Sequence, residues 1–489
     1  MLTQPLRPSV KFLSDSLIDK IVDESCQLLE RIGVFVENQE AMELFLEAGA
    51  KADPSSRRVY IPRKLVDDAL KSAPRTITLF DARGEKSFLI GGDEIHFDPG
   101  STALRLFDHR TQSERKAVTA DLVRFSSLIQ RLENFHFQST GLISSDVPEA
   151  VSDCYRLFIA LQNCTKPIVT GLFVVEGFKP MLDMLVAVRG SAAELKEQPL
   201  AIFDACPSPP LKWSNLTSQS LIECARAGIP SELVSMPLTG ATAPITLTGS
   251  LVQLTAENLA GVVITQLAMP GAPVIFGGSP SCFDMHTANP PMGAIETMMI
   301  DSGYSQIGKS LGLPTHAYMG LSDSKCVDAQ AGLETGMGAV LAALSGINVI
   351  SGGGMMDFES TQSLEKLVID NDICGMAYRM IGGISQRDET MALDLFLEGG
   401  SGIDFLTHPH TLRWHLEEQK YPEIINRDGY QQWIDEGKPT LADRAAAKVE
   451  EFLGGDRAPV LSSEVVRDLK RIVEQHAKRM GFATLPALD

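Results

Sequence analysis

The feature that most constrains the fold is a repeated order of elements, in which a short apolar run is followed by a loop and then by an amphipathic, helix-like segment. Near-continuous apolar strands that alternate with helices are typical of parallel βα units, because helices then cover the faces of the strands. Eight such apolar runs follow one another along the chain, at residues 95–99, 135–140, 167–172, 200–205, 233–237, 273–276, 315–319 and 348–351.

Eight units that close on themselves form a (β/α)8 TIM barrel, whereas an open, doubly wound sheet is the structural alternative. No GxGxxG or GxxxxGK[ST] motif follows any of the runs, which removes the usual support for a nucleotide-binding open sheet. We therefore predict an α/β protein built on a (β/α)8 barrel.

The regions on either side of the repeat have patterns of their own. Residues 15–50 show helical spacing of apolar residues, with Ser14 or Asp15 as the cap. The sequence then predicts a short strand and a Pro-started helix within 57–74, and a hairpin within 76–92. After residue 365 the chain is mostly helical, and we expect the aromatic-rich segment 405–433 to dock on the surface. We divide the chain into N-terminal helices and a hairpin packing on the barrel (1–94), the barrel itself (95–365) and C-terminal helices (366–489).

Composition excludes several classes of function. The formal net charge of −19, from 43 Lys and Arg against 62 Asp and Glu, argues against a nucleic-acid partner or an anionic membrane surface. None of the eight Cys forms a CxxC pair, and His408 and His410 have no Cys or carboxylate at ligand spacing, so we expect reduced thiols and no metal site. The first residues lack the apolar core of a signal peptide and no long apolar stretch runs unbroken, which predicts a cytoplasmic protein without a membrane span.

The barrel hypothesis locates the chemistry, because reacting residues lie at the C-terminal ends of barrel strands. Asp98 ends the first apolar run directly before Pro99 and Gly100, and a carboxylate near a core is costly unless it has a function. We predict that Asp98 is catalytic. His286, in the loop after the sixth run, is the second catalytic candidate, although a loop histidine is more often only solvated. Other candidates at the expected strand ends are Phe97, Gln138, Asp204, Phe276, Tyr318, Gly352, Gly353 and Phe358.

Long ordered stretches of this sequence resemble the trimethylamine methyltransferase superfamily, the corrinoid-dependent methylamine and betaine methyltransferases. The resemblance covers essentially the whole chain, and it implies a (β/α)8 barrel. The stretches that carry it are PLTGATAPITLTGSLVQLTAENLAG (237–261), MGLSDSKCVDAQAGLE (319–334), NVISGGGM (348–355), SLEKLVIDNDI (363–373) and HTLRWHLEEQKYPEIINRDGYQQW (410–433).

The archaeal trimethylamine enzymes of this family carry pyrrolysine, whereas every position here is a standard residue. The chain is therefore similar to glycine betaine:corrinoid methyltransferases. This resemblance implies that a quaternary amine, glycine betaine first, gives a methyl group to the Co(I) of a corrinoid protein and leaves as a tertiary amine such as dimethylglycine. The chain has no Asp-x-His-x-x-Gly motif, so we expect the corrinoid on a separate partner and none tightly bound here. We also expect a homo-oligomer.

The chemistry of such a substrate gives the candidate residues their roles. A quaternary ammonium leaves as a neutral amine without needing a proton, so positioning and electrostatics suffice. Aromatic faces or a carboxylate recognise the cationic head, and backbone amides recognise a substrate carboxylate. We therefore assign substrate binding to Phe97, Gln138, Phe276, Tyr318, Gly352, Gly353 and Phe358, and let Asp98 orient the head or act through a water. The open alternatives are proline betaine, carnitine or trimethylamine as substrate, or an amine-binding barrel without catalysis.

Overall fold

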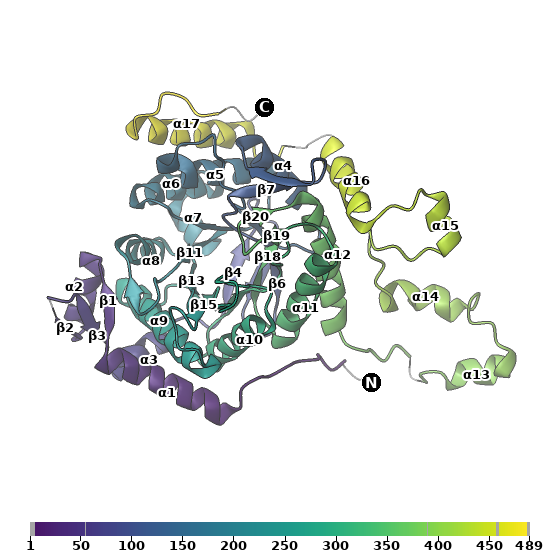
Figure 1. Ribbon diagram of the computed structural model, residues 1–489, viewed down its shortest axis with the longest axis horizontal. Coiled ribbons are helices and arrows are strands. Elements are labelled where there is room, and N and C mark those ends of the chain that lie inside the picture. Colours follow the sequence, from purple (N-terminus) through teal and green to yellow (C-terminus); the bar gives the residue numbers. More distant parts are fainter. Residues whose placement is uncertain (1–4, 54, 389, 456–458, 487–489) are drawn as a thin grey trace.

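The computed structural model describes residues 5–53, 55–388, 390–455 and 459–486. Strands lie at the centre of the body, helices surround them, and residues near α13–α15 project to one side (Figure 1). The mixed α/β class predicted from the sequence is confirmed.

Each of the eight apolar runs overlaps a central strand, and the pairs formed among these strands are parallel. One sheet has the order β15-β13-β11-β10-β9, and another has the order β17-β18-β6. Single parallel bridges, Phe97 to Phe135 and Phe276 to Thr315, connect the two sheets at both junctions. The strands are β6 (His96–Pro99), β9 (Gln138–Ser139), β10 (Ile168–Gly171), β11 (Ala201–Ala205), β13 (Ser231–Ser235), β15 (Val274–Gly278), β17 (His316–Tyr318) and β18 (Val349–Gly353).

Helices follow the strands and cover their outer face (Figure 1). Several begin at a side-chain cap, such as Ser214, Thr246, Asp328 and Ser363, which accepts a backbone N–H of the first turn. They are α4 (Thr119–Ile129), α5 (Glu149–Asn163), α6 (Phe178–Arg189), α7 (Ala192–Glu197), α8 (Asn215–Ala227), α9 (Leu247–Ala268), α10 (Ile295–Ser310), α11 (Ala329–Ser345) and α12 (Leu364–Ile381). Helix α9 is long and apolar enough to cross a membrane, but 78% of its most apolar window is buried in the protein, which is typical of a core helix.

The N-terminal region closes one end of this assembly. The hairpin of β4 (Ile77–Phe80) and β5 (Ser87–Ile90) forms as predicted, and its apolar side chains pack on the first residues of the central strands. The residues in this cluster are Ile77, Leu79, Ile90, Phe137, Val169, Ile202, Ile275 and Val349. The hairpin therefore covers the N-terminal ends of the strands.

The prediction of one helix over residues 15–50 is wrong in one respect, because two helices form there, α1 (Asp15–Arg31) and α2 (Gln39–Glu47). Gly33 adopts a φ of +72°, and a Cβ at this position would lie 2.5 Å from the Val59 carbonyl oxygen. The chain therefore turns after α1, which Ser14 caps as expected, and continues as β1 (Val34–Val36). The remaining elements nearby are β2 (Lys51–Asp53), β3 (Arg58–Tyr60), α3 (Arg63–Ser72) and β12 (Lys212–Trp213).

Short strands lie within the loops at the C-terminal ends of the central strands, and helices form the last part of the chain. The strands are β7 (Arg105–Asp108), β8 (Ser113–Lys116), β14 (Leu238–Thr239), β16 (Ser281–Cys282), β19 (Met355–Met356) and β20 (Thr361–Gln362). The helices are α13 (Leu393–Gly399), α14 (Pro409–Glu418), α15 (Tyr430–Asp435), α16 (Leu441–Gly454) and α17 (Ser463–Arg479), with one-turn helices η1 (Val175–Gly177) and η2 (Gly400–Gly402).

The segment 405–433 differs from the expectation of a docked surface piece. Ile424 is buried, and its backbone N–H donates to Asp372 of α12. Helices α14 and α15, however, have no buried residue and extend away from the body (Figure 1).

Candidate functional site

Polar side chains from neighbouring central strands meet inside the ring of helices. Asp98 of β6 is only 1% exposed, and Phe97 beside it packs edge-on against Tyr378 of α12, with ring centroids 5.4 Å apart. Because successive strand residues point to opposite faces, Asp98 points away from the helices. The same alternation turns Glu232 of β13, His316 of β17 and Ser351 of β18 inward.

These inward side chains form a continuous polar chain. The Ser351 hydroxyl donates to Asp98 Oδ2 at 2.6 Å, and His316 Nε2 lies 3.0 Å from Ser351 Oγ. His316 Nδ1 lies 3.2 Å from Glu232 Oε1, although the pair does not have hydrogen-bond angles. Burial lowers the pKa of His316 to about 3, so the imidazole is neutral. The Ser351 hydroxyl donates its hydrogen bond to Asp98, so its oxygen can only accept a hydrogen bond from His316. His316 therefore carries its proton on Nε2 and presents an unprotonated Nδ1 to Glu232.

Glu232 and Asp204 form a carboxyl pair at the centre of the site. Burial, followed by the charges of Asp204 and Asp98, raises the pKa of Glu232 well above its ordinary value. Burial also raises the pKa of Asp204 to about 7, while the neighbouring Glu232 carboxyl and the charge of Arg156 act in the opposite direction. The pair therefore retains a proton at neutral pH. A protonated Glu232 also explains why its carboxyl can approach the bare Nδ1 of His316.

Arg156 of α5 brings the nearest buried cation to this pair. Its Nη1 donates to the Thr140 carbonyl at 2.8 Å, and its guanidinium lies 4.3 Å from the centroid of the Phe173 ring. Burial lowers the pKa of Arg156 to about 10, which leaves the group charged at neutral pH. Its Nε and Nη2 atoms have no hydrogen-bond partner among the described residues.

Several other atoms of the cluster are also buried without a hydrogen-bond partner in the described part of the chain. They are Asp98 Oδ1, Asp204 Oδ1, both carboxyl oxygens of Glu232 and His316 Nδ1. Leaving one buried polar group unsatisfied costs about 1–3 kcal/mol, and more for a charged one. So many in one cluster indicate a site that can bind a polar ligand.

The walls of the site come from the ends of the strands and from the loop after β18. Tyr318 of β17 meets His316 edge-on, with ring centroids 5.0 Å apart, and burial raises the pKa of its phenol well above the ordinary value. Gly277 leaves room for the imidazole, because a Cβ there would lie 2.8 Å from His316 Nδ1. Burial also raises the pKa of Glu359 to about 7, although part of this side chain is exposed.

The loop after β18 is held in an unusual conformation. Gly352 and Gly354 have φ values of +121° and +80°, and Asp357, Phe358 and Glu359 follow at +50°, +54° and +66°. Three consecutive non-glycine residues in the left-handed region store strain, which surrounding contacts must offset. On one side the Gly354 N–H donates to Asp370 of α12 at 2.7 Å, and Asp370 is paired with buried Lys366.

Not all residues predicted from the sequence reach the cluster. Asp98 and Tyr318 belong to it, and Gly352 and Gly353 lie at the end of β18 beside it. Phe358 is half-buried, with Lys325 Nζ 3.9 Å from its ring centroid. Phe97, Phe276, Gln138 and His286 lie elsewhere.

The reasons for these four placements are local. Phe97 and Phe276 face the helix layer, Phe276 beside Gly308 of α10. The Gln138 amide donates to the carbonyls of Cys164 and Lys166, which precede β10, so it faces the opposite end of the strands. His286 is exposed in a loop whose N–H groups donate to Asp284.

Sequence reasoning did not single out Glu232, His316 or Arg156. A signal for Glu232 existed, because it is a carboxylate within an apolar run, as Asp98 is. The predicted run began at residue 233, one position after it.

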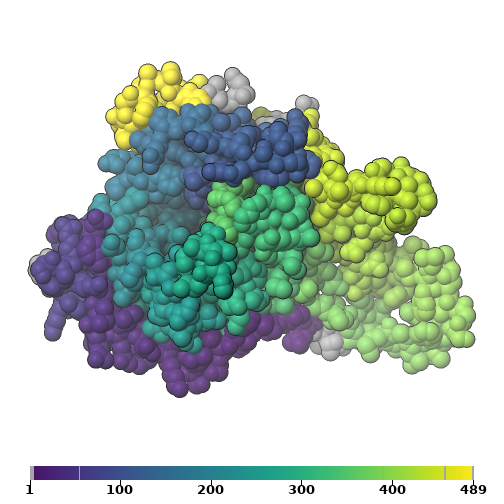
Figure 2. Space-filling model, viewed as in Figure 1, coloured from purple at the N-terminus to yellow at the C-terminus, as the bar shows by residue number. Residues whose placement is uncertain are grey.

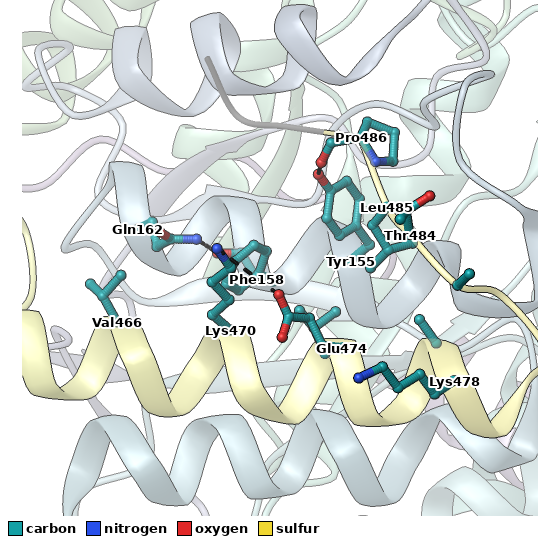
Figure 3. A pocket seen from close by; sticks show the side chains of 13 residues that line it. Tyr155, Phe158, Gln162, Val466, Lys470, Glu474, Lys478, Thr484, Leu485 and Pro486 are labelled. Carbon is teal, nitrogen blue, oxygen red and sulfur yellow. Dashed lines mark hydrogen bonds and ion pairs between the residues drawn. The ribbon is translucent and has the colours of Figure 1, made fainter.

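A separate cavity of about 640 Å³ lies between α5 and α17, outside the helix layer (Figure 3). Tyr155 and Phe158 form one wall, Lys470 and Glu474 another, and the Tyr155 hydroxyl donates to the Pro486 carbonyl at 2.5 Å. No residue of the polar cluster lines it.

Comparisons with known proteins agree with one another. The family described as trimethylamine methyltransferase (MTTB) matches residues 2–481. A trimethylamine methyltransferase MttB from Desulfitobacterium hafniense (strain DSM 10664 / DCB-2) is 32% identical over 96% of this chain and 95% of its own. A glycine betaine methyltransferase from D. hafniense (strain Y51) is 30% identical over 97% and 99%. A trimethylamine methyltransferase MttB from Methanosarcina barkeri (strain Fusaro / DSM 804) is 31% identical over 91% of each chain.

Among solved structures, the monomethylamine methyltransferase MtmB of M. barkeri superposes with a TM-score of 0.54 at 12% identity, covering 92% of this chain and 90% of that one. At this identity the likeness concerns the fold alone.

Proposed function

Because the chain belongs to the trimethylamine methyltransferase family, and is therefore a methyltransferase, we propose that it transfers a methyl group from glycine betaine to the Co(I) of a separate corrinoid protein. Dimethylglycine is the other product. The observation that carries the proposal is the buried cluster of Asp98, Asp204 and Glu232, whose unpartnered oxygens suit a cationic head group. The 30% identity to a glycine betaine methyltransferase and the absence of a nonstandard residue in the sequence support this substrate.

In this proposal the eight central strands form one closed (β/α)8 barrel with its reacting end at the polar cluster. The parallel bridges at both sheet junctions support closure. The hairpin β4–β5 covers the opposite end, so a substrate and a corrinoid partner approach from the side of the loops. The N-terminal region 1–94 and the C-terminal helices remain attachments to this barrel, and α12 serves as its eighth helix.

The chain's own residues bind and orient the substrate. Asp98, held by Ser351, faces the trimethylammonium group together with the Tyr318 ring. The free Nε and Nη2 of Arg156 form the planar fork that pairs with a carboxylate, so Arg156 binds the carboxylate of glycine betaine. Gly352 and Gly353, with Phe358 at the rim, close the site around it. The corrinoid supplies the Co(I) that accepts the methyl group.

Two wider properties belong to the same proposal. The eight cysteines are free in the structure, which suits a reducing cytoplasm. We also propose that the enzyme works as a homo-oligomer.

A substrate panel tests the function directly. Glycine betaine, proline betaine, carnitine, choline and trimethylamine are each incubated with the protein and a Co(I) corrinoid, and methylation is followed by cobalt absorbance. We expect glycine betaine to react fastest and to yield one equivalent of dimethylglycine. A faster reaction with trimethylamine contradicts the substrate assignment, and binding without any transfer contradicts the enzymatic role of the cluster.

A further inference from the structure

The C-terminal arm, defined as residues 384–435 without residue 389, leaves the end of α12 and carries α13, α14 and α15. It projects from the body as a separate lobe (Figures 1 and 2). None of the residues in its three helices is buried. Eleven of the twenty-four exposed large apolar side chains of the described chain lie on it: Ile384, Met391, Leu393, Phe396, Leu397, Phe405, Leu406, Leu412, Leu416, Tyr421 and Tyr430.

Such an arm needs a surface to pack against. Its helices have 7, 10 and 6 residues, and helices shorter than about 12 residues are marginal in water unless an apolar face is buried. Taking roughly 180 Å² as the full surface of one large apolar residue, these eleven leave on the order of 1,300 Å² exposed. A stable interface needs about 800 Å² from each partner, so the area is sufficient for one.

The arm is nevertheless fixed to the body rather than loosely attached. Arg379 of α12 donates to the Glu418 carbonyl at 3.2 Å, and Arg387 Nε donates to Glu418 Oε1 at 2.6 Å. The Trp414 indole N–H donates to Asp388 at 3.2 Å. Polar groups of the arm are thus paired within it and with α12, while its apolar side chains face outward. A partner therefore meets a preorganised apolar surface.

A second apolar surface lies at the root of the arm. A groove of about 590 Å³ is lined by Leu6, Pro8, Met376, Met380 and Ile384, where the N-terminal segment crosses the end of α12. Leu6 is 85% exposed and Ile384 is 91% exposed. Arm and groove therefore lie side by side on the same face of the molecule.

This face lies away from the polar cluster. The Tyr378 hydroxyl, in the last turn of α12, is 3.4 Å from the carbonyl of Ile95, which directly precedes β6. The arm therefore leaves at the N-terminal end of the strands, whereas the cluster and the loops through which a corrinoid protein approaches lie at the other end.

We propose that the arm packs against a second copy of this chain and inserts its apolar face into the groove at the end of the partner's α12. Since each copy carries both surfaces, the exchange is reciprocal and closes as a symmetric pair. A second copy is also present whenever the chain is, which a permanently exposed apolar arm requires. This inference specifies the surface of the oligomer and does not depend on the identity of the substrate.

Sedimentation velocity of the full chain tests the proposal. We expect the wild type to sediment as a dimer of the 53.0 kDa chain or a closed multiple of it. Leu406→Asp combined with Leu416→Asp should produce monomers with an unchanged circular dichroism spectrum, because both side chains are exposed in the single copy. Met380→Asp in the groove should weaken association at least about tenfold, which corresponds to 1.4 kcal/mol. The matched control is Leu46→Asp, an exposed leucine of α2 on the opposite side of the body (Figure 1).

Hydrogen exchange gives a second measurement that needs no substitution. Amides of α13 and α14 should be protected at high protein concentration and exposed after dilution. A wild type that is monomeric at every concentration overturns the proposal. So does an oligomer that survives the arm substitutions, and an oligomer that Met380→Asp leaves intact rules out the groove as the partner surface.

Discussion

Asp98→Asn should reduce activity while leaving the protein at least as stable as the wild type. The substitution keeps the size of the side chain and an oxygen that accepts the Ser351 hydroxyl, now at 2.6 Å from Asp98 Oδ2, but it removes the negative charge that Asp98 offers to a bound cation. A charged hydrogen bond or contact contributes about 1.5–3 kcal/mol, and each 1.4 kcal/mol is a factor of ten. We therefore expect kcat/KM for glycine betaine to fall by about 10- to 150-fold.

Asp98→Asn should stabilise the folded protein although it lowers the activity. Burial raises the pKa of Asp98 well above its ordinary value, with the Ser351 hydrogen bond acting against this and the charge of Asp204 adding to it. Between the unfolded pKa and this raised folded pKa, the native state binds more protons than the unfolded state, so stability falls as pH rises through that window. Asparagine does not titrate. As pH increases from about 4 towards neutrality, the melting temperature of Asp98→Asn should therefore rise relative to that of the wild type.

The assay pairs methyl transfer to Co(I) with thermal melts across that pH range, both on protein whose circular dichroism matches the wild type. Full activity in the folded variant would refute the role of Asp98 towards the cation. A variant that loses stability at neutral pH would instead show that the Asp98 charge serves the fold.

Three further predictions follow from other parts of the site. Because the pKa of Asp204 is raised to about 7, kcat/KM for a cationic amine should increase with pH up to about 7, and Asp204→Asn should flatten that limb of the pH profile. Arg156→Lys keeps the positive charge but loses the planar guanidinium that can pair with a carboxylate, so KM for glycine betaine should rise by about tenfold. Turnover of choline, which has no carboxylate, should change little. Equal effects on both substrates would contradict this role of Arg156. Lys366→Met leaves Asp370 buried without its partner and should lower the free energy of unfolding by about 3 kcal/mol in a urea titration, whereas an unchanged midpoint would show that the pair is neutral for stability.

The fold was largely predictable because its signal is repeated. Eight apolar runs at regular intervals each became a parallel strand, and the loop caps that begin the helices are polar residues visible in the sequence. The prediction of one helix over residues 15–50 is wrong because Gly33 adopts a positive φ and approaches Val59 closely, and the chain turns there. The prediction that residues 405–433 dock on the body failed for α14 and α15 because nothing local in the sequence decides whether a short helix packs on its own body.

The candidate site was predictable only in part, for a geometric reason. The predicted end of a strand indicates which residues lie near the site. Successive side chains of a strand point to opposite faces, however, so a shift of one residue decides whether a side chain points into the polar cluster or into the helix layer. Asp98 and Phe97 are neighbours in sequence and face opposite sides. Arg156 could not be found from strand ends at all, because it reaches the cluster from α5.

The protonation of the cluster bears on how a methyl group could leave a substrate held there. A site that attracted the trimethylammonium head with three full negative charges would stabilise the ground state more than the transition state, in which the positive charge is already disappearing. The proton kept by the Asp204–Glu232 pair at neutral pH removes part of that charge. Asp98 then holds the head, Arg156 holds the other end, and the pair adds little attraction that transfer would have to overcome. After transfer the amine is neutral, so the attraction of the cluster for the product is weaker than for the substrate. The same arrangement that costs stability in the free protein thus favours binding of the cation and release of the amine.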